Sequence, residues 1–155
     1  MNYLPLIKQL RLLGEQRQAR TERELRQAQG QIEELQAALA ACDERMGEYR
    51  EAIARMHAEV GLTLDRAAFF ERKRKEAVLL SKLAAQRMER EGLEEQESDV
   101  QRHAHELQQV LDALQAKEQK WEKVEQHLRR QQKTHRLRLT RKAIENSVAC
   151  KQLHS

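Results

Sequence analysis

Residues 25–60 read LRQAQGQIEELQAALAACDERMGEYREAIARMHAEV, and the spacing of their hydrophobic residues decides the fold. Steps of alternately three and four residues from Leu25 to Val60 meet a hydrophobic side chain every time, and the other hydrophobic residues here are all alanine. Such a repeat places one apolar stripe along a supercoiled helix, whereas a β-strand needs a repeat of two and a disordered chain has none. The stretch therefore predicts a long coiled-coil helix. The stripe consists of Leu25, Ala28, Ile32, Leu35, Leu39, Cys42, Met46, Tyr49, Ile53, Met56 and Val60.

The composition of the chain agrees with long helices and argues against a compact globular core. Of the 155 residues, 35% are charged and 3% are aromatic, and there are one proline and five glycines. Many charged residues with few helix breakers are typical of coiled coils. The sequence has no Gly-rich phosphate loop, nucleophile elbow or paired metal-ligand spacing. We therefore expect a protein that is not an enzyme and that uses no cofactor, metal or small-molecule substrate.

One break interrupts the helical pattern, in EVGLTLDRAAFF at residues 59–70. Gly61 suits the left-handed position that follows a helix end. Thr63 or Asp65 can cap the amide groups that open the next helix. Two long amphipathic helices joined by a short loop pack side by side and antiparallel.

These features predict an all-α fold, a long antiparallel two-helix coiled-coil hairpin with a short loop near residues 60–65. We expect a single domain over residues 1–155, with the first helix at about 5–60 and the second at about 66–150. Because the second helix is the longer one, its C-terminal segment is expected to project past the N-terminus.

Outside residues 25–60 the apolar stripes follow other registers. Upstream, Leu6, Leu10 and Leu13 form a stripe of their own, which we expect beside residues 113–122. In the second helix the register is expected to slip near Gly92, which changes the supercoil locally. The register before the slip contains Phe70, Ala77, Leu80 and Ala84. The register after it contains Leu93, Val100, Leu107, Val110, Leu114, Trp121, Val124 and Leu128.

The formal charge of +4 is concentrated near the C-terminus. The last 41 residues carry 11 Lys or Arg against 4 Asp or Glu, a net charge of +7. This segment predicts an electrostatic contact with an acidic partner. Nucleic acid is disfavoured as that partner, because neither stacking aromatics nor a known nucleic-acid-binding motif follows Trp121.

The two cysteines and the hydropathy indicate a cytoplasmic protein. Cys42 and Cys150 stand alone, which fits a reducing compartment. The N-terminal segment alternates leucine with charge too quickly for a signal peptide, and no run approaches the roughly 18 apolar residues of a membrane span.

The few aromatic residues are candidates for protein contacts. Phe69 and Phe70 are adjacent, so one helical face cannot bury both, and an exposed aromatic near the loop marks a binding surface. Tyr49 and Trp121 fall on the predicted stripes, where core packing and partner contact are both open.

Local strings resemble one known family. GEYREAI (47–53) and GLTLDR (61–66), followed by aromatic residues, are similar to flagellar members of the YscO/FliJ family, and KEQKW (117–121) before a basic, glutamine-rich tail is similar to virulence-type members. This family comprises the central stalk proteins of type III secretion and flagellar export ATPases. The resemblance extends over nearly the whole chain.

The resemblance implies an antiparallel coiled coil whose termini bind the central pore of a hexameric secretion ATPase. It also implies that the loop side contacts the cytoplasmic domain of the export gate, that secretion chaperones are further partners, and that the protein is peripheral to the inner-membrane apparatus. Tyr49 matches a gate-binding aromatic of flagellar members, and Phe69 or Phe70 matches a second one. The implied ATPase-binding residues are Leu6, Leu10, Leu13, Arg129, Arg130, Arg136, Arg138, Arg141 and Lys142.

An alternative function requires no secretion apparatus. A coiled-coil scaffold or tether could use the same basic C-terminal segment to bind nucleic acid or an anionic surface. Binding of that kind weakens steeply with salt, because each neutralised phosphate releases a counterion.

Overall fold

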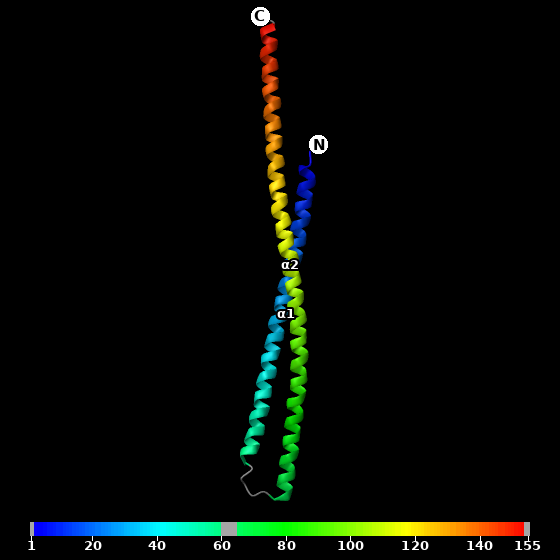
Figure 1. Cartoon of the computed structure of the whole chain (residues 1–155), viewed down its shortest axis with the longest axis vertical. Helices are drawn as coiled ribbons and strands as arrows, with labels where there is room; N and C mark the ends of the chain where they lie inside the picture. Colours follow the sequence, from blue (N-terminus) through cyan, green and yellow to red (C-terminus); the bar gives the residue numbers. More distant parts are fainter. Residues whose placement is uncertain (1, 60–64, 154–155) are drawn as a thin grey trace. The chain divides into compact units, whose positions relative to one another are not determined.

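The computed structural model describes residues 2–59 and 65–153, and within them the chain forms two helices (Figure 1). Helix α1 spans Leu4–Ala58 and has 55 residues, and α2 spans Arg66–Leu153 and has 88. Neither described range contains a strand. The predicted all-α fold with two long helices is confirmed. Most of the predicted loop, including Gly61 and Thr63, lies outside the described residues.

Asp65 caps the start of α2. Its Oδ1 accepts a hydrogen bond of 2.7 Å from the amide of Ala68, and its carbonyl oxygen accepts one of 3.0 Å from the amide of Phe69. An N-cap carboxylate satisfies amide groups that have no partner within the helix and also complements the positive end of the helix dipole. Asp65 therefore serves as the cap that the sequence predicts.

The chain divides into two compact units, each made of one segment of α1 and one of α2. The terminal unit comprises residues 1–23 and 108–155, and the middle unit comprises residues 24–107. The single domain of the sequence analysis stays a prediction.

The α1 stripe is the buried side of the helix in the middle unit. Every stripe residue from 25 to 56 is buried or half-buried. Cys42 is fully enclosed, and Ala28 and Met46 are 3% and 5% exposed. The heptad stripe of α1 is therefore confirmed, apart from Val60, which lies outside the described residues.

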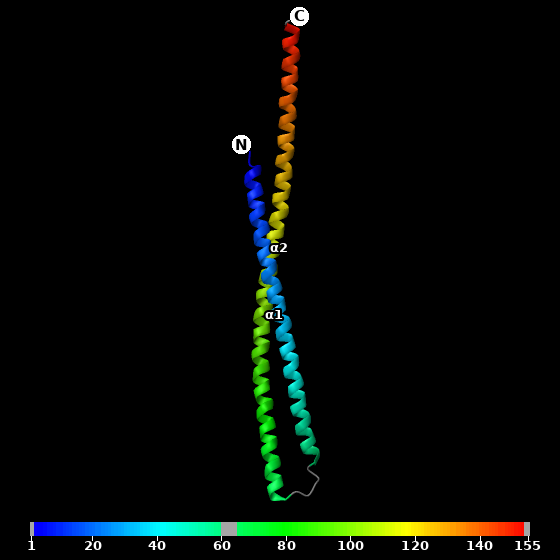
Figure 2. The same cartoon turned by 180° about the vertical axis from the view of Figure 1, so that it is seen from behind.

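The two segments of the middle unit run antiparallel. Asp43 on α1 accepts a hydrogen bond of 2.6 Å from Arg90, whereas His57, further along α1, lies 3.0 Å from Glu76, which comes earlier in α2. Partners in this opposite order require antiparallel helices. Figures 1 and 2 show the two segments side by side from opposite directions.

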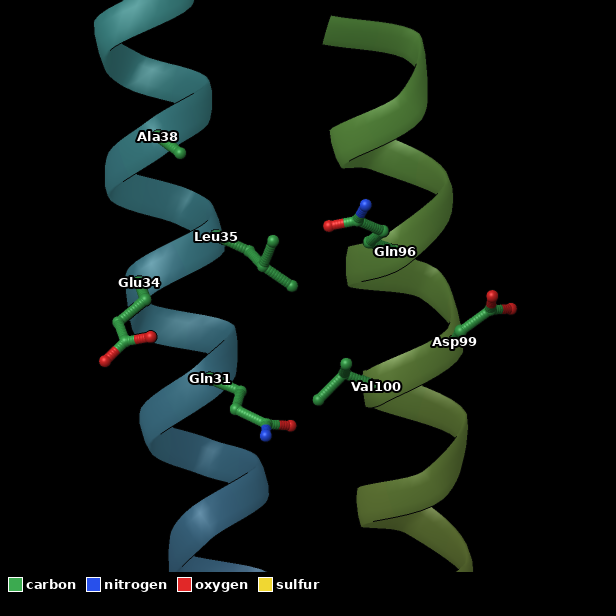
Figure 3. Close-up of a pocket in the computed structure, with 7 residues that line it drawn as sticks. All are labelled: Gln31, Glu34, Leu35, Ala38, Gln96, Asp99 and Val100. Atoms are coloured by element: carbon green, nitrogen blue, oxygen red, sulfur yellow. The ribbon is translucent and has the colours of Figure 1, made fainter. Parts of the chain in front are cut away.

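A close-up of the same unit shows how the facing residues meet (Figure 3). Leu35 on α1 and Val100 on α2 point toward each other between the helices, and Gln96 also points inward. Glu34 and Asp99 point away from the other helix. Apolar and polar side chains thus share the interface, while carboxylates one position away reach solvent.

The register predicted for the first part of α2 is wrong. Phe70, Ala77, Leu80 and Ala84 are exposed, although they form the longest apolar pattern there. Buried and half-buried residues instead recur at steps of three and four on both sides of Gly92, so the predicted register slip does not occur. From Arg72 onward they are Arg72, Glu76, Leu79, Leu83, Gln86, Arg90, Leu93, Glu97, Val100, Ala104 and Leu107. Charged residues hold several of these positions because they pair with α1, so apolar spacing alone selects the wrong face.

In the terminal unit, two residues of the register predicted for α2 are also displaced by one position from the buried side. Residues 114, 121 and 128 are half-buried as predicted, but Val110 and Val124 are 49% and 40% exposed. The buried positions beside them are Leu111 and Glu125, which are 7% and 5% exposed. At position 125 a carboxylate therefore occupies the inner position, and the apolar Val110 and Val124 lie on the flank.

The terminal unit is also antiparallel, and its α2 segment is longer than its α1 segment. Arg11 bonds Glu118, within the predicted stretch 113–122, whereas Gln132 donates a hydrogen bond of 2.7 Å to Asn2, so the residues just before α1 lie beside a later part of α2. Every described residue from 133 to 153 is exposed. In Figures 1 and 2 this segment, the orange and red end of α2, continues past the start of α1. We call residues 133–153 the overhang.

A pair of leucine substitutions tests the corrected register of α2. Leu83 is 5% exposed and Leu80 is 48% exposed. Leu83→Ala deletes buried methyl groups and leaves a cavity, so we expect a loss of about 2 kcal/mol or more in the free energy of unfolding. Leu80→Ala should change it by at most about 0.5 kcal/mol. Urea unfolding followed by circular dichroism measures both, and a larger loss for Leu80→Ala than for Leu83→Ala would support the original register instead.

Candidate protein-binding surfaces

Two adjacent aromatic rings lie exposed at the start of α2. Phe69 and Phe70 are 48% and 47% exposed, and their ring centroids are 5.9 Å apart at 69°, an edge-to-face contact. The guanidinium carbon of Arg66 lies 5.6 Å from the Phe70 ring, and Nζ of Lys73 lies 5.8 Å from the Phe69 ring. The cations sit over ring faces, where the aromatic quadrupole attracts them. The pair thus forms an apolar surface bordered by positive charge.

The Phe70 ring begins an apolar stripe on the outer side of α2. Ala77, Ala84 and Met88 follow it at helical spacing, and all four residues are exposed. Successive residues of a helix are about 100° apart, which puts these four roughly 100–140° around the helix from Leu83, on its outer side. The stripe that the sequence analysis assigned to the core is therefore largely an outward surface, which we call the outer stripe.

Tyr49 lies apart from the two phenylalanines. It is half-buried on the α1 stripe and faces α2. Arg45, one turn earlier, donates a hydrogen bond of 3.1 Å to Gln86, whereas Glu59 pairs with Arg72 at 2.6 Å. The level of Tyr49 therefore falls between these two pairs, several turns from Phe69. The structure brings Phe69 and Phe70 together and leaves Tyr49 in the helix interface.

The predicted basic residues gather on the overhang and just before it. The overhang carries six Lys or Arg against one Glu, a net charge of +5. Arg129 differs from the others, because it donates a hydrogen bond of 2.6 Å to the buried Glu125. The exposed basic residues of the predicted set are Arg129, Arg130, Arg136, Arg138, Arg141 and Lys142.

The predicted leucines of α1 are in the terminal unit. Leu6 and Leu13 are 53% and 52% exposed, and Leu10 is half-buried. Their stripe lies beside the buried side of α1, which here carries Ile7 at 4% exposure. Leu10 and Leu13 line a groove together with Trp121 of α2, which is half-buried.

Sequence reasoning missed a charge network inside the terminal unit. Arg11 donates hydrogen bonds of 2.9 and 2.6 Å to Oε1 of Glu118, and it also bonds Oε2 of Glu125. Oε1 of Glu125 accepts the bond from Arg129 described above. Position 11 lies two heptads before Leu25. Continuing the heptad pattern of α1 toward the N-terminus would therefore have placed Arg11 at an inner position.

The network changes the ionisation of its members. The hydrogen bond from Arg11 is the main reason why the pKa of Glu125 lies below its ordinary value, and the charge of Arg129 adds to it, against the opposing effect of burial. The pKa of Arg11 is raised, first by its hydrogen bonds to Glu118 and then by those to Glu125. Both groups are therefore held in their charged forms.

The described residues offer neither a metal centre nor a membrane span. No group of three or more His, Cys, Asp or Glu in residues 2–59 and 65–153 could hold a metal ion. In the same residues, neither helix has an apolar stretch that is long enough to cross a membrane. What the fold presents instead is a set of exposed helical surfaces with distinct chemistry.

A family model described as Salmonella surface presentation of antigen gene type M protein matches residues 6–148. The chain belongs to this family. The match confirms the resemblance to the stalk proteins of type III secretion. The chain is therefore a type III secretion-associated protein, and its family indicates partners in the secretion apparatus. No curated protein and no solved structure matches the chain significantly.

The lowered pKa of Glu125 predicts an acid-sensitive terminal unit in this type M family member. Because the folded-state pKa lies below the unfolded one, the stabilisation is complete above the ordinary carboxyl pKa of about 4.3 and is lost as the pH falls through the folded value. Arg11→Gln should lower the melting temperature at pH 7 and flatten its decline toward low pH. Thermal melts across this range measure both effects.

Arg23→Gln is the matched control for Arg11→Gln. Arg23 is exposed on the same segment of α1, so its replacement should leave the pH profile unchanged. A profile of Arg11→Gln that is identical to the parent profile would contradict the role of the network.

Proposed function

We propose that the chain is the stalk protein of a type III secretion apparatus, cytoplasmic and peripheral to the membrane. In this role it binds the central pore of the hexameric secretion ATPase and the cytoplasmic domain of the export gate. The observation that carries the proposal is the presence of two exposed surfaces of opposite character on different units, a basic overhang and an apolar outer stripe with paired aromatics. Membership of the family supports it.

The overhang is suited to a ring-shaped acidic partner. It is a single helix with every described residue exposed, so its charges are open to contact from all sides. Unneutralised positive charge attracts an acidic pore rim over a distance of about a Debye length, and such contacts depend little on side-chain fit. This chemistry suits a stalk held inside a ring.

The outer stripe is suited to a different contact. Exposed aromatic rings supply most of the binding energy where they become enclosed by a partner. Phe70 has small neighbours along its face, Ala77 and Ala84, so a partner can approach the helix closely. We assign the export-gate contact to this surface, with Tyr49 supporting α1 behind it. Secretion chaperones are a further class of partner implied by the resemblance.

The competing function is a scaffold whose overhang binds nucleic acid or an anionic surface. The same net charge of +5 favours it, since electrostatic binding does not distinguish an acidic protein from a polyanion. The outer stripe has no role in that function. Experiments on the two surfaces therefore separate the candidates.

Neutralising the overhang tests the ATPase contact. A variant with Arg136, Arg138, Arg141 and Lys142 replaced by Gln removes four of its charges, so we expect most of the stimulation of the cognate hexameric ATPase to disappear. Phosphate release with and without the purified chain measures this effect. Retention on a heparin column, measured in parallel, reports the affinity for polyanions.

A control variant removes the same charge elsewhere. Arg26, Arg50, Lys82 and Arg87 are exposed in the middle unit, and their replacement by Gln should leave stimulation intact. Equal losses in both variants would mean that net charge alone matters. If the parent chain has no effect on the ATPase but binds heparin through the overhang, the scaffold function is favoured instead.

Truncating Phe70 tests the gate contact. Phe70→Ala should weaken binding to the cytoplasmic domain of the export gate by about tenfold or more, as for a central interface aromatic. Helicity should be unchanged, because the ring is 47% exposed. Calorimetric titration and circular dichroism measure the two quantities.

Val78→Ala is the control for Phe70→Ala. Val78 is 52% exposed but lies about a quarter of a turn away from the outer stripe. Unchanged affinity for Phe70→Ala, or an equal loss for Val78→Ala, would remove the outer stripe from the gate contact.

A further inference from the structure

An apolar groove runs between α1 and α2 in the terminal unit. Its volume is about 520 Å³, which falls within the ~300–1,000 Å³ of typical binding pockets. Figures 1 and 2 show the two segments that form it side by side, α1 in blue and α2 in yellow. Its apolar lining is made by Leu10, Leu13, Gly14, Leu114, Trp121 and Val124.

The groove exists because apolar residues of this unit occupy the flanks of the interface. Arg11 and Glu118 take inner positions, so Leu13 and Val124 remain 52% and 40% exposed beside them. Leu6 and Val110 extend the exposed apolar surface along the two helices. Two helices alone cannot bury both an inner seam and a flank, and an exposed apolar patch rimmed by polar residues marks a docking site.

The rim of the groove is positively charged. Arg17, Lys117 and Lys120 line it, and none of the three forms an ion pair with the described part of the chain. Glu118 also lines it, but its carboxylate is neutralised by Arg11. An occupant therefore meets an apolar floor between uncompensated cations.

We infer that this groove docks an acidic amphipathic α-helix of a partner protein. Rows of side chains from two antiparallel helices form the seat for a third helix, whose residues at i, i+3, i+4 and i+7 fill the apolar floor. Glutamates or aspartates on either side of that face meet the three cations. The inference rests on the proposed function, since Leu10 and Leu13 belong to the ATPase-binding set, and it specifies the kind of segment that meets them.

Gly14 leaves room for the occupant. A Cβ built on this residue, which lines the groove, would meet no atom within 4 Å, so the position begins in open space. Leucine is also a better helix former than glycine. Gly14→Leu is therefore expected to preserve the fold while it closes the site, which separates docking from stability.

Trp121 provides the measurement, because it is the one tryptophan of the chain and lines the groove. The probe is a designed helical peptide of about 20 residues with leucines at heptad spacing and glutamates on both flanks. Binding is expected to shift the Trp121 emission to shorter wavelength in a saturable manner. A peptide of the same composition in scrambled order should produce no shift.

The variants test the apolar floor and the charged rim separately. Gly14→Leu should weaken peptide binding at least tenfold, whereas Gly92→Leu, at another helical glycine with open space around it, should leave binding unchanged. The double variant Lys117→Glu with Lys120→Glu should lose the acidic peptide and bind an analogue whose flanks carry lysine.

Three results would overturn the inference. They are the absence of an emission shift, equal binding of the scrambled peptide, and unchanged binding by Gly14→Leu. A shift that grows with protein concentration in the absence of peptide would assign the groove to a second copy of the chain instead. If the chain stimulates the ATPase but its groove does not bind the peptide, the inference is refuted and the proposed function stands. If the groove binds the peptide but the chain leaves the ATPase unaffected, the proposed function is refuted and the inference stands.

Discussion

The packing of one side of α1 against one side of α2 is the interaction on which the paired surfaces of both units depend. Long helices in water take most of their stability from an apolar face that is buried, and here that face is one side of each helix. Cys42 and Met46 are enclosed in the middle unit and Ile7 in the terminal unit, and within each unit the direction of the other side chains follows from the helical repeat. The exposure of Phe70 on the outer side of the middle unit and that of Leu13 beside the interface of the terminal unit are consequences of this packing.

The interface is only partly apolar, and this limits what the sequence could predict. The α1 stripe was predicted correctly because ten successive inner positions are hydrophobic, from Leu25 to Met56. In α2 the inner positions include Arg90 and Glu125, whose partners are on the other helix. A pattern of hydrophobic residues contains no information about such pairs, so it selected the neighbouring apolar face.

The candidate surfaces were predictable to different degrees, for the same physical reason. Adjacent aromatics cannot share one buried face, and this local argument predicted that one of Phe69 and Phe70 is exposed, whereas both are. The exposure of the basic segment likewise followed from the unequal helix lengths. The groove beside Trp121 could not be foreseen, because it depends on which position of each heptad faces inward. A shift of one residue in register converts a core leucine into part of a binding surface.

The charged residues of the interface also bear on stoichiometry. In a parallel pair of identical helices each inner residue meets its own copy. Arg11 would then face Arg11, and Glu125 would face Glu125, so like charges would be desolvated together at considerable cost. In the folded chain the same residues meet opposite charges of the other helix. The polar interface thus favours a chain that folds on itself over a parallel dimer of straight helices, and the free energy that holds it together is intramolecular.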